Sequence, residues 1–173
     1  MTNLSELRVT IDALFAQVKT LAGHADWTPG YKGEGKRWLS PLAVDGVTTD
    51  MKLCVDYYPH SHELKFSITL VYETAVARLD FWSLDKHLNH PVKGVKMPSH
   101  ISMGWVYGSH IHSWHDNKTL VTSNAPPKEL EFAHKIPGSI HSFNAAFRYF
   151  CDMVGVVVAE SEMPNPPKRD TLL

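Results

Sequence analysis

Three consecutive segments of the chain alternate apolar and polar residues with a period of two, and this pattern limits the folds that the chain can adopt. The segments are MKLCVDYY (51–58), LKFSITLVY (64–72) and VARLDFW (76–82), with short polar connections between them. Successive side chains of a β-strand point to opposite faces of its sheet, so each segment has one apolar and one polar face. Short connections between such strands favour antiparallel pairing. We therefore predict an antiparallel meander, with RWLSPLAV (37–44) as an edge strand because Pro41 lacks the N–H group that a central ladder needs.

Two further segments carry apolar residues at spacings of three and four, which is typical of a helix with one buried face. The first spans about residues 4–22 and the second spans 139–154, and each is followed by a glycine that is a natural stop. Each apolar stripe needs a partner surface, and the apolar face of the sheet provides it. The sequence thus predicts a two-layer α+β domain, with an antiparallel sheet of about five or six strands covered by an N-terminal and a C-terminal helix.

The length of the chain, 173 residues, fits a single domain. We expect one α+β domain over residues 1–158, followed by a flexible, proline-rich C-terminal tail over 159–173. The first residues carry charges where a secretion signal has an uninterrupted apolar core, and no run of about 18 apolar residues occurs. A cytoplasmic protein without a membrane span is expected. The formal net charge of −1 argues against a nucleic-acid footprint spread over the whole surface.

Histidines are concentrated in one part of the chain. Six of the eleven lie between positions 87 and 115, namely His87, His90, His100, His110, His112 and His115. Residues 109–115 have the pattern of a strand that continues into a hairpin turn at 116–117. On such a strand His110 and His112 share one face and Ile111 takes the other, which suits the apolar side. We therefore expect both imidazoles on the open face of the sheet, near the histidines of the preceding loop. Solvated positions are expected for the more distant histidines, namely His24, His60, His62 and His134.

One function that such a cluster suits is metal-independent cleavage of RNA. One imidazole would deprotonate a 2′-hydroxyl group while a second protonated the leaving 5′-oxygen, because the pKa of histidine lies near the working pH. We expect His110 and His112 to form this acid–base pair. His87 and His90 would assist them, and Lys118 would hold the phosphate. This chemistry needs no cofactor, and aromatic side chains beside the cluster would stack on bases.

Two other interpretations of the cluster remain open. Neutral imidazoles suit zinc or another transition metal, and an H-x-H pair on a strand is a common start to such a site. His110 and His112 would then bind the metal together with His90. Other candidates for this third position are His87, His115 and Asp116. Alternatively, the protein has no enzymatic activity and docks on a protein partner through its histidine- and tryptophan-bearing face. A homodimer is compatible with each interpretation.

Five short motifs follow one another between residues 64 and 153: FSITLVYE, RLDFW, HLNHPVKG, SHIHSW and SFNAAFRYF. In this order they resemble an uncharacterised family of small bacterial and phage-borne proteins. The resemblance implies an accessory protein of a mobile element, which acts either as a toxin-like enzyme or as an inhibitor by contact. The chain departs from the family pattern at Ser113 and Trp114, where an Ala-Thr pair is expected. The positions that match are His87, His90, His110 and His112.

Overall fold

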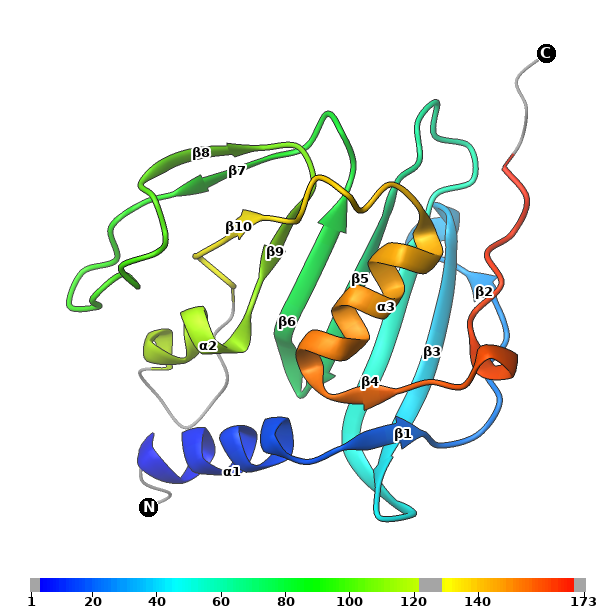
Figure 1. Ribbon diagram of the computed structural model, residues 1–173, viewed down its shortest axis with the longest axis horizontal. Helices are drawn as coiled ribbons and strands as arrows, with labels where there is room; N and C mark the ends of the chain where they lie inside the picture. The colour runs from blue at the N-terminus through cyan, green and yellow to red at the C-terminus, as the bar shows by residue number, and fades with distance from the viewer. Residues whose placement is uncertain (1–3, 122–128, 170–173) are drawn as a thin grey trace.

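Figure 1 shows a computed structural model of the protein, which describes residues 4–121 and 129–169. Within these ranges the strands of the main sheet are β1 (Lys19–Leu21), β2 (Thr28–Pro29), β3 (Lys36–Val44), β4 (Val47–Tyr57), β5 (Phe66–Tyr72), β6 (Thr74–Phe81), β9 (His110–His112), β10 (His134–Lys135) and β11 (Val156–Val157). Their order is β10-β9-β6-β5-β4-β3-β1-β11, and β2 pairs with β3 beside this path. A separate two-stranded sheet is formed by β7 (Lys86–Asn89) and β8 (Gly104–Tyr107).

The helices in the described ranges are α1 (Leu4–Ala16), α2 (Trp114–Asn117) and α3 (Phe143–Val154), with 3₁₀ turns at Tyr31–Gly33, Lys118–Leu120 and Glu160–Glu162. The predicted α+β class and the antiparallel meander are therefore confirmed. The predicted strand number is wrong, because the main sheet also contains short strands that carry no alternating pattern of their own. The predicted two-layer arrangement also differs from the structure, since the two long helices do not lie together on the sheet (Figure 1).

The apolar face of the meander is the core of the molecule. In the antiparallel register Val55 of β4 lies beside Ile68 of β5, and Ile68 lies beside Leu79 of β6. These three side chains are fully buried. Helix α3 crosses this face (Figure 1), where Phe147 packs edge-on against Trp38 of β3. The alternation of the sequence thus sets both the register and the buried side of the sheet.

Helix α3 begins and ends at residues that cap it. The Ser142 hydroxyl accepts a hydrogen bond from the backbone N–H of Ala145, which satisfies one of the free donors of the first turn. At the other end Gly155 adopts the left-handed conformation, with φ of 68°. This backbone conformation favours glycine and terminates the helix before β11. The helix therefore starts four residues later than predicted from its apolar stripe alone, which began at Ser139.

The predicted N-terminal helix is shorter than its apolar stripe. Helix α1 ends at Ala16, and residues 19–21 form β1 instead of a further helical turn. The Lys19 ammonium group donates hydrogen bonds of 2.7 Å to the carbonyl oxygens of Leu14 and Gln17, which the end of the helix leaves unpaired. In Figure 1, α1 lies beside α2 past one end of β6, away from the face that α3 covers.

The predicted position of β3 at the edge of the sheet is wrong. This strand lies between β4 and β1, and Pro41 sits where the register with β4 shifts. A bulge accommodates proline because the regular ladder is interrupted there. Beyond β3, β1 pairs in parallel with β11, so the chain segments after α1 and after α3 lie side by side.

The strand predicted over 109–115 ends at His112. Ser113 adopts an extended conformation and accepts a hydrogen bond of 3.1 Å from the N–H of Asp116, which starts α2. The predicted hairpin turn at 116–117 is therefore part of a helix. Trp114 is buried against Phe15 of α1, and its indole N–H donates to Asp12.

Residues after α3 return to the body of the protein. Arg148 bonds Glu160, and the Arg169 side chain donates to the carbonyl oxygens of Ser61 and His62. Glu160 and Arg169 belong to the segment 159–173 that was predicted as a flexible tail, and in the structure both contact other parts of the chain. In the part of the chain that the structure describes, no helix has both the length and the apolar character needed to span a membrane.

Candidate metal centre

His110 and His112 project from one face of β9, as the alternation of this strand predicts. Pairing with β6 places His110 beside Asp80 and His112 beside Arg78. Ile111 lies between the two histidines and turns to the opposite, apolar face, where it is fully buried. The two imidazoles therefore share a face with one acidic and one basic side chain.

These two imidazoles are buried, although they lie on the more polar face of the sheet. Their exposed fractions are 1% for His110 and 0% for His112. Strand β7 brings His87 against both rings, with centroid distances of 5.6 Å to His110 and 4.5 Å to His112. One nitrogen atom of each ring lies within 4.8 Å of the corresponding atoms of the other two. We call His87, His110 and His112 the three-histidine cluster.

Hydrogen bonds to backbone carbonyl groups show which nitrogen atom carries a hydrogen in two of the three rings. His87 donates from Nε2 to the carbonyl oxygen of Glu131 at 2.8 Å, and His110 donates from Nδ1 to that of Gly108 at 2.9 Å. A carbonyl oxygen only accepts, so these two nitrogen atoms carry the hydrogen in each ring. In the neutral rings, Nδ1 of His87 and Nε2 of His110 then keep their lone pairs. Metal-binding histidines are commonly oriented in this way by a carbonyl group behind the ring.

The third ring, that of His112, makes no well-formed hydrogen bond from either nitrogen, and both atoms are buried. Burial lowers its pKa well below 6.5, and the nearby Arg78, His87 and His110 act in the same direction, opposed by a weak contact with the backbone of Leu130. The ring is thus neutral at pH 7. A buried polar group without a partner costs about 1–3 kcal/mol. A bound cation would remove this cost, because the unprotonated nitrogen atom of the His112 ring would coordinate it through its lone pair, which makes no well-formed hydrogen bond within the described residues.

Asp80 adds a carboxylate to the cluster. Its Oδ2 atom lies 3.6 Å from Nε2 of His110 and 3.7 Å from Nε2 of His112. The same oxygen accepts a hydrogen bond of 2.7 Å from Nε of Arg78, which holds it in place. The cluster therefore has three imidazoles and one oriented carboxylate, a donor set that suits zinc and other first-row divalent metals.

The other predicted site residues lie outside the cluster. The His90 ring is half exposed, and its Nε2 lies 3.5 Å from a carboxylate oxygen of Glu131. The Lys118 ammonium group is paired with Asp12 of α1 at 3.1 Å. His87, rather than His90, approaches His110 and His112, because it lies within β7 and faces β9. A strand assignment for residues 86–89 would have indicated this, since alternation places His87 and Asn89 on one face.

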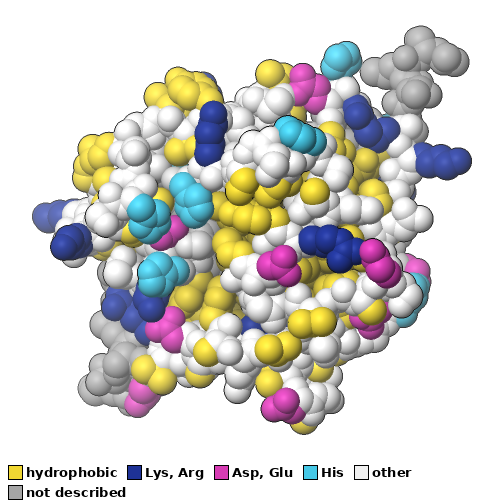
Figure 2. Space-filling model, viewed as in Figure 1, with side chains coloured by type: hydrophobic (Ala, Val, Ile, Leu, Met, Phe, Trp, Pro, Cys, Tyr) yellow, Lys and Arg dark blue, Asp and Glu magenta, His cyan; other side chains and the backbone are white. Residues whose placement is uncertain are grey.

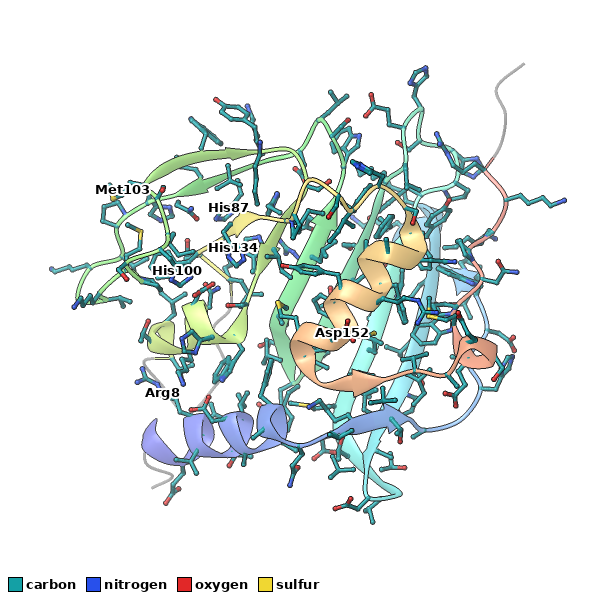
Figure 3. All side chains as sticks on the ribbon, in the orientation of Figure 1. Arg8, His87, His100, Met103, His134 and Asp152 are labelled. Atoms are coloured by element: carbon teal, nitrogen blue, oxygen red, sulfur yellow. The ribbon has the colours of Figure 1, made fainter. Side chains whose placement is uncertain are left out.

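A second group forms from residues that the sequence did not connect: His100, Asp116 and His134. Nε2 of His100 lies 2.9 Å from Oδ1 of Asp116, and Nδ1 of His134 lies 3.4 Å from Oδ2. Figure 3 labels His100 and His134, which lie close together near β10 and α2. Burial tends to raise the pKa of Asp116, but contacts with His134 and Ser113 and the nearby His100 outweigh it and hold the pKa below 3.8. The carboxyl group is therefore ionised between the two imidazoles.

Comparison with known proteins found no matching family model, no matching curated protein and no matching solved structure.

Proposed function

We propose that the protein binds one divalent transition metal ion, zinc being the best match, through Nδ1 of His87, Nε2 of His110 and a ring nitrogen of His112. The observation that carries this proposal is the convergence of three imidazoles, each with one nitrogen atom within 4.8 Å of those of the other two. Backbone carbonyl groups hold two of the rings in the matching tautomer, and neither nitrogen of the third ring makes a well-formed hydrogen bond within the described residues. Neutral imidazole is the form of histidine that binds a metal.

Asp80 is the natural fourth ligand. Metal–ligand bonds of about 2.1 Å in a tetrahedral site place ligand atoms about 3.4 Å apart. The separations between Oδ2 of Asp80 and the two Nε2 atoms, 3.6 and 3.7 Å, approach this value. Four protein ligands in a buried place form a closed site, which is typical of a structural metal. The metal would then fasten β7, which belongs to the separate small sheet, to β9 of the main sheet.

Burial also distinguishes this proposal from metal-independent RNA cleavage by His110 and His112. A general base has to come within hydrogen-bond distance of the substrate hydroxyl group. The two rings are 1% and 0% exposed, so an RNA backbone has no access to them in this conformation. Metal binding needs no such access once the ion is in place.

Elemental analysis of the purified full-length protein tests the proposal. We expect bound zinc in the wild type, and one equivalent less in His87→Gln and in His112→Gln. His90→Gln is the matched control, because this ring lies outside the cluster, and its zinc content should equal that of the wild type. Circular dichroism identifies a variant that has not folded. His87→Gln keeps the test available if the fully buried His112→Gln does not fold.

The proposal is refuted if wild-type protein neither contains zinc nor takes it up after incubation with zinc chloride. Equal zinc content in the wild type and in both cluster variants would refute it as well. Loss of the metal in His90→Gln but not in His87→Gln would instead support the ligand set that includes His90.

A further inference from the structure

His100, Asp116 and His134 come from three separate parts of the chain and have the composition of a metal-binding triad. Two imidazoles and one carboxylate are the set that binds iron(II) on one side and leaves other coordination positions open. One atom from each of the three side chains lies within 4.8 Å of the others. Metal–ligand bonds of about 2.1 Å give adjacent ligand separations of about 3.0 Å in octahedral and about 3.4 Å in tetrahedral geometry. The two separations, 2.9 and 3.4 Å, lie within about 0.1 Å of the range that these two geometries span.

The carboxylate of this triad is held in place before any ligand binds. Asp116 is 2% exposed, and its Oδ2 accepts a hydrogen bond of 2.7 Å from the Ser113 hydroxyl group. Nδ1 of His134 is buried and makes no well-formed hydrogen bond, although it lies near that carboxylate. A buried carboxyl group flanked by two imidazole nitrogen atoms at 2.9 and 3.4 Å is an arrangement that a cation between them would stabilise.

This triad borders an open cavity. The cavity has a volume of about 340 Å³, and both His100 and His134 line it. Figure 2 shows histidine side chains gathered on the surface over α2 and β10. Trp105, Tyr107 and Lys135 also line this cavity. An ion held by the triad would therefore have room for additional ligands on the cavity side.

We propose that His100, Asp116 and His134 form a second, open site for a divalent transition metal, and that its free coordination positions bind a small anionic molecule in the adjoining cavity. This site does not depend on the three-histidine cluster, because the two groups share no residue. Triads of this composition are used where a protein leaves metal positions free for an external ligand.

The walls of the cavity indicate the chemistry of that ligand. Lys135 contributes a positive charge, which favours an anion. Trp105 and Tyr107 are both large exposed side chains of β8, with ring centroids 6.4 Å apart. The ammonium group of Lys86, which lies outside the cavity lining, is 5.0 Å from the centroid of the Trp105 ring. The cavity therefore suits a small anion that also carries a flat group to lie against the aromatic rings.

Titration of metal-free full-length protein with cobalt(II) tests the site, because the absorption of cobalt(II) reports its coordination. We expect His100→Gln and His134→Gln each to bind one cobalt equivalent less than the wild type. His115→Gln is the matched control, since His115 is exposed on the same short helix as Asp116 but lies outside the triad. His100 is half exposed, so its substitution leaves the core intact.

Azide, a small anion that binds cobalt, distinguishes an open site from a closed one. We expect azide to change the cobalt spectrum of His87→Gln, in which the open site remains, and to leave that of His100→Gln unchanged. Lys135→Gln should weaken azide binding about fivefold, the effect of losing one nearby positive charge.

The inference is overturned if His100→Gln and His134→Gln bind as much cobalt as the wild type, or if azide leaves the spectrum of cobalt-loaded His87→Gln unchanged. A different result is expected if the three-histidine cluster binds no metal but the triad does. In that case His87→Gln binds as much cobalt as the wild type, while His100→Gln binds less.

Discussion

Asn117 and Phe132 are joined by two hydrogen bonds, in which the side-chain amide of Asn117 takes the place that a backbone amide of a neighbouring β-strand would occupy. The Asn117 amide donates to the Phe132 carbonyl oxygen at 2.9 Å, and the Phe132 N–H donates to the Asn117 amide oxygen at 2.9 Å. Asn89 makes the equivalent pair with Ala133, with distances of 2.8 and 2.9 Å. Two buried side-chain amides thus hold the backbone that leads into His134.

Asn117→Ala should therefore destabilise the protein. It leaves the buried N–H and carbonyl groups of Phe132 without their Asn117 partners, and an unsatisfied buried group costs about 1–3 kcal/mol. The Ser113 carbonyl keeps its hydrogen bond from the backbone N–H of position 117. We expect a loss of this size in the free energy of unfolding, measured by urea denaturation at pH 7. Asn144→Ala, on the exposed side of α3, is the control and should change stability little. Equal stability of the two variants would contradict the role given to Asn117.

Lys19 should make stability depend on pH in the alkaline range. Burial lowers its pKa from 10.5 to about 8. Between these values the unfolded chain binds more protons than the folded one, so the contribution of Lys19 to the free energy of unfolding increases with pH. The stabilising contribution of Lys19 reaches its full value above pH 10.5, the pKa in the unfolded chain, and is lost as the pH falls toward about 8, the pKa in the folded protein. Urea denaturation at pH 8, 9 and 10 measures the slope.

Lys19→Met should have a smaller slope than the wild type over that range. Lys52→Met, at an exposed position of β4, is the control and should keep the wild-type slope. Other groups also titrate here, so the difference between variants is the relevant quantity. A Lys19→Met slope equal to that of Lys52→Met would show that the buried ammonium group is not its source.

The two cysteines should be unreactive in the folded protein. Both are free and buried, and burial raises the pKa of Cys54 to about 11 and that of Cys151 to about 12. Because the thiolate is the reactive form, a disulfide reagent such as DTNB should label neither at pH 8 until urea is added. Unfolded protein should then react at two sites, and Cys54→Ser or Cys151→Ser at one. Rapid labelling without urea would mean that one thiol is accessible in the native state.

Zinc should slow hydrogen exchange at the junction of the two sheets. If the ion links His87 to His110 and His112, opening of β7 away from β9 requires its release. We expect slower amide exchange in residues 86–89 and 110–112 of zinc-loaded protein than of EDTA-treated protein, measured by mass spectrometry. Helix α3 provides the internal reference and should change little. Equal protection of β7 with and without zinc would argue that the metal does not connect the sheets.

The parts of the fold that were predictable from sequence are those set by local alternation. Val55, Ile68 and Leu79 have the predicted period, and their strands pair as expected. The same rule placed His110 and His112 on one face, opposite Ile111. The apolar stripe of α1 was less informative, because Lys19 and its neighbours form a strand with a distant partner, β11. Tertiary pairing overrode a helical pattern there.

The candidate sites were only partly predictable for the same reason. Which of His87 and His90 approaches His110 depends on where β7 begins, and on a hydrogen bond to Glu131, 44 residues away. The triad of His100, Asp116 and His134 has no local signature at all. It exists because α2 and β10 bring three distant segments together, and Ser113 starts α2 where a strand was predicted.

The parallel pairing of β1 with β11 has a consequence for synthesis of the protein. As the chain leaves the ribosome from its N-terminus, β1 emerges early, but its partner is translated more than a hundred residues later. Until then the nascent chain exposes an unpaired edge, which is prone to association with other chains. The sheet therefore cannot be completed before β11 has been synthesised, and expression together with a ribosome-bound chaperone should increase the yield of folded protein.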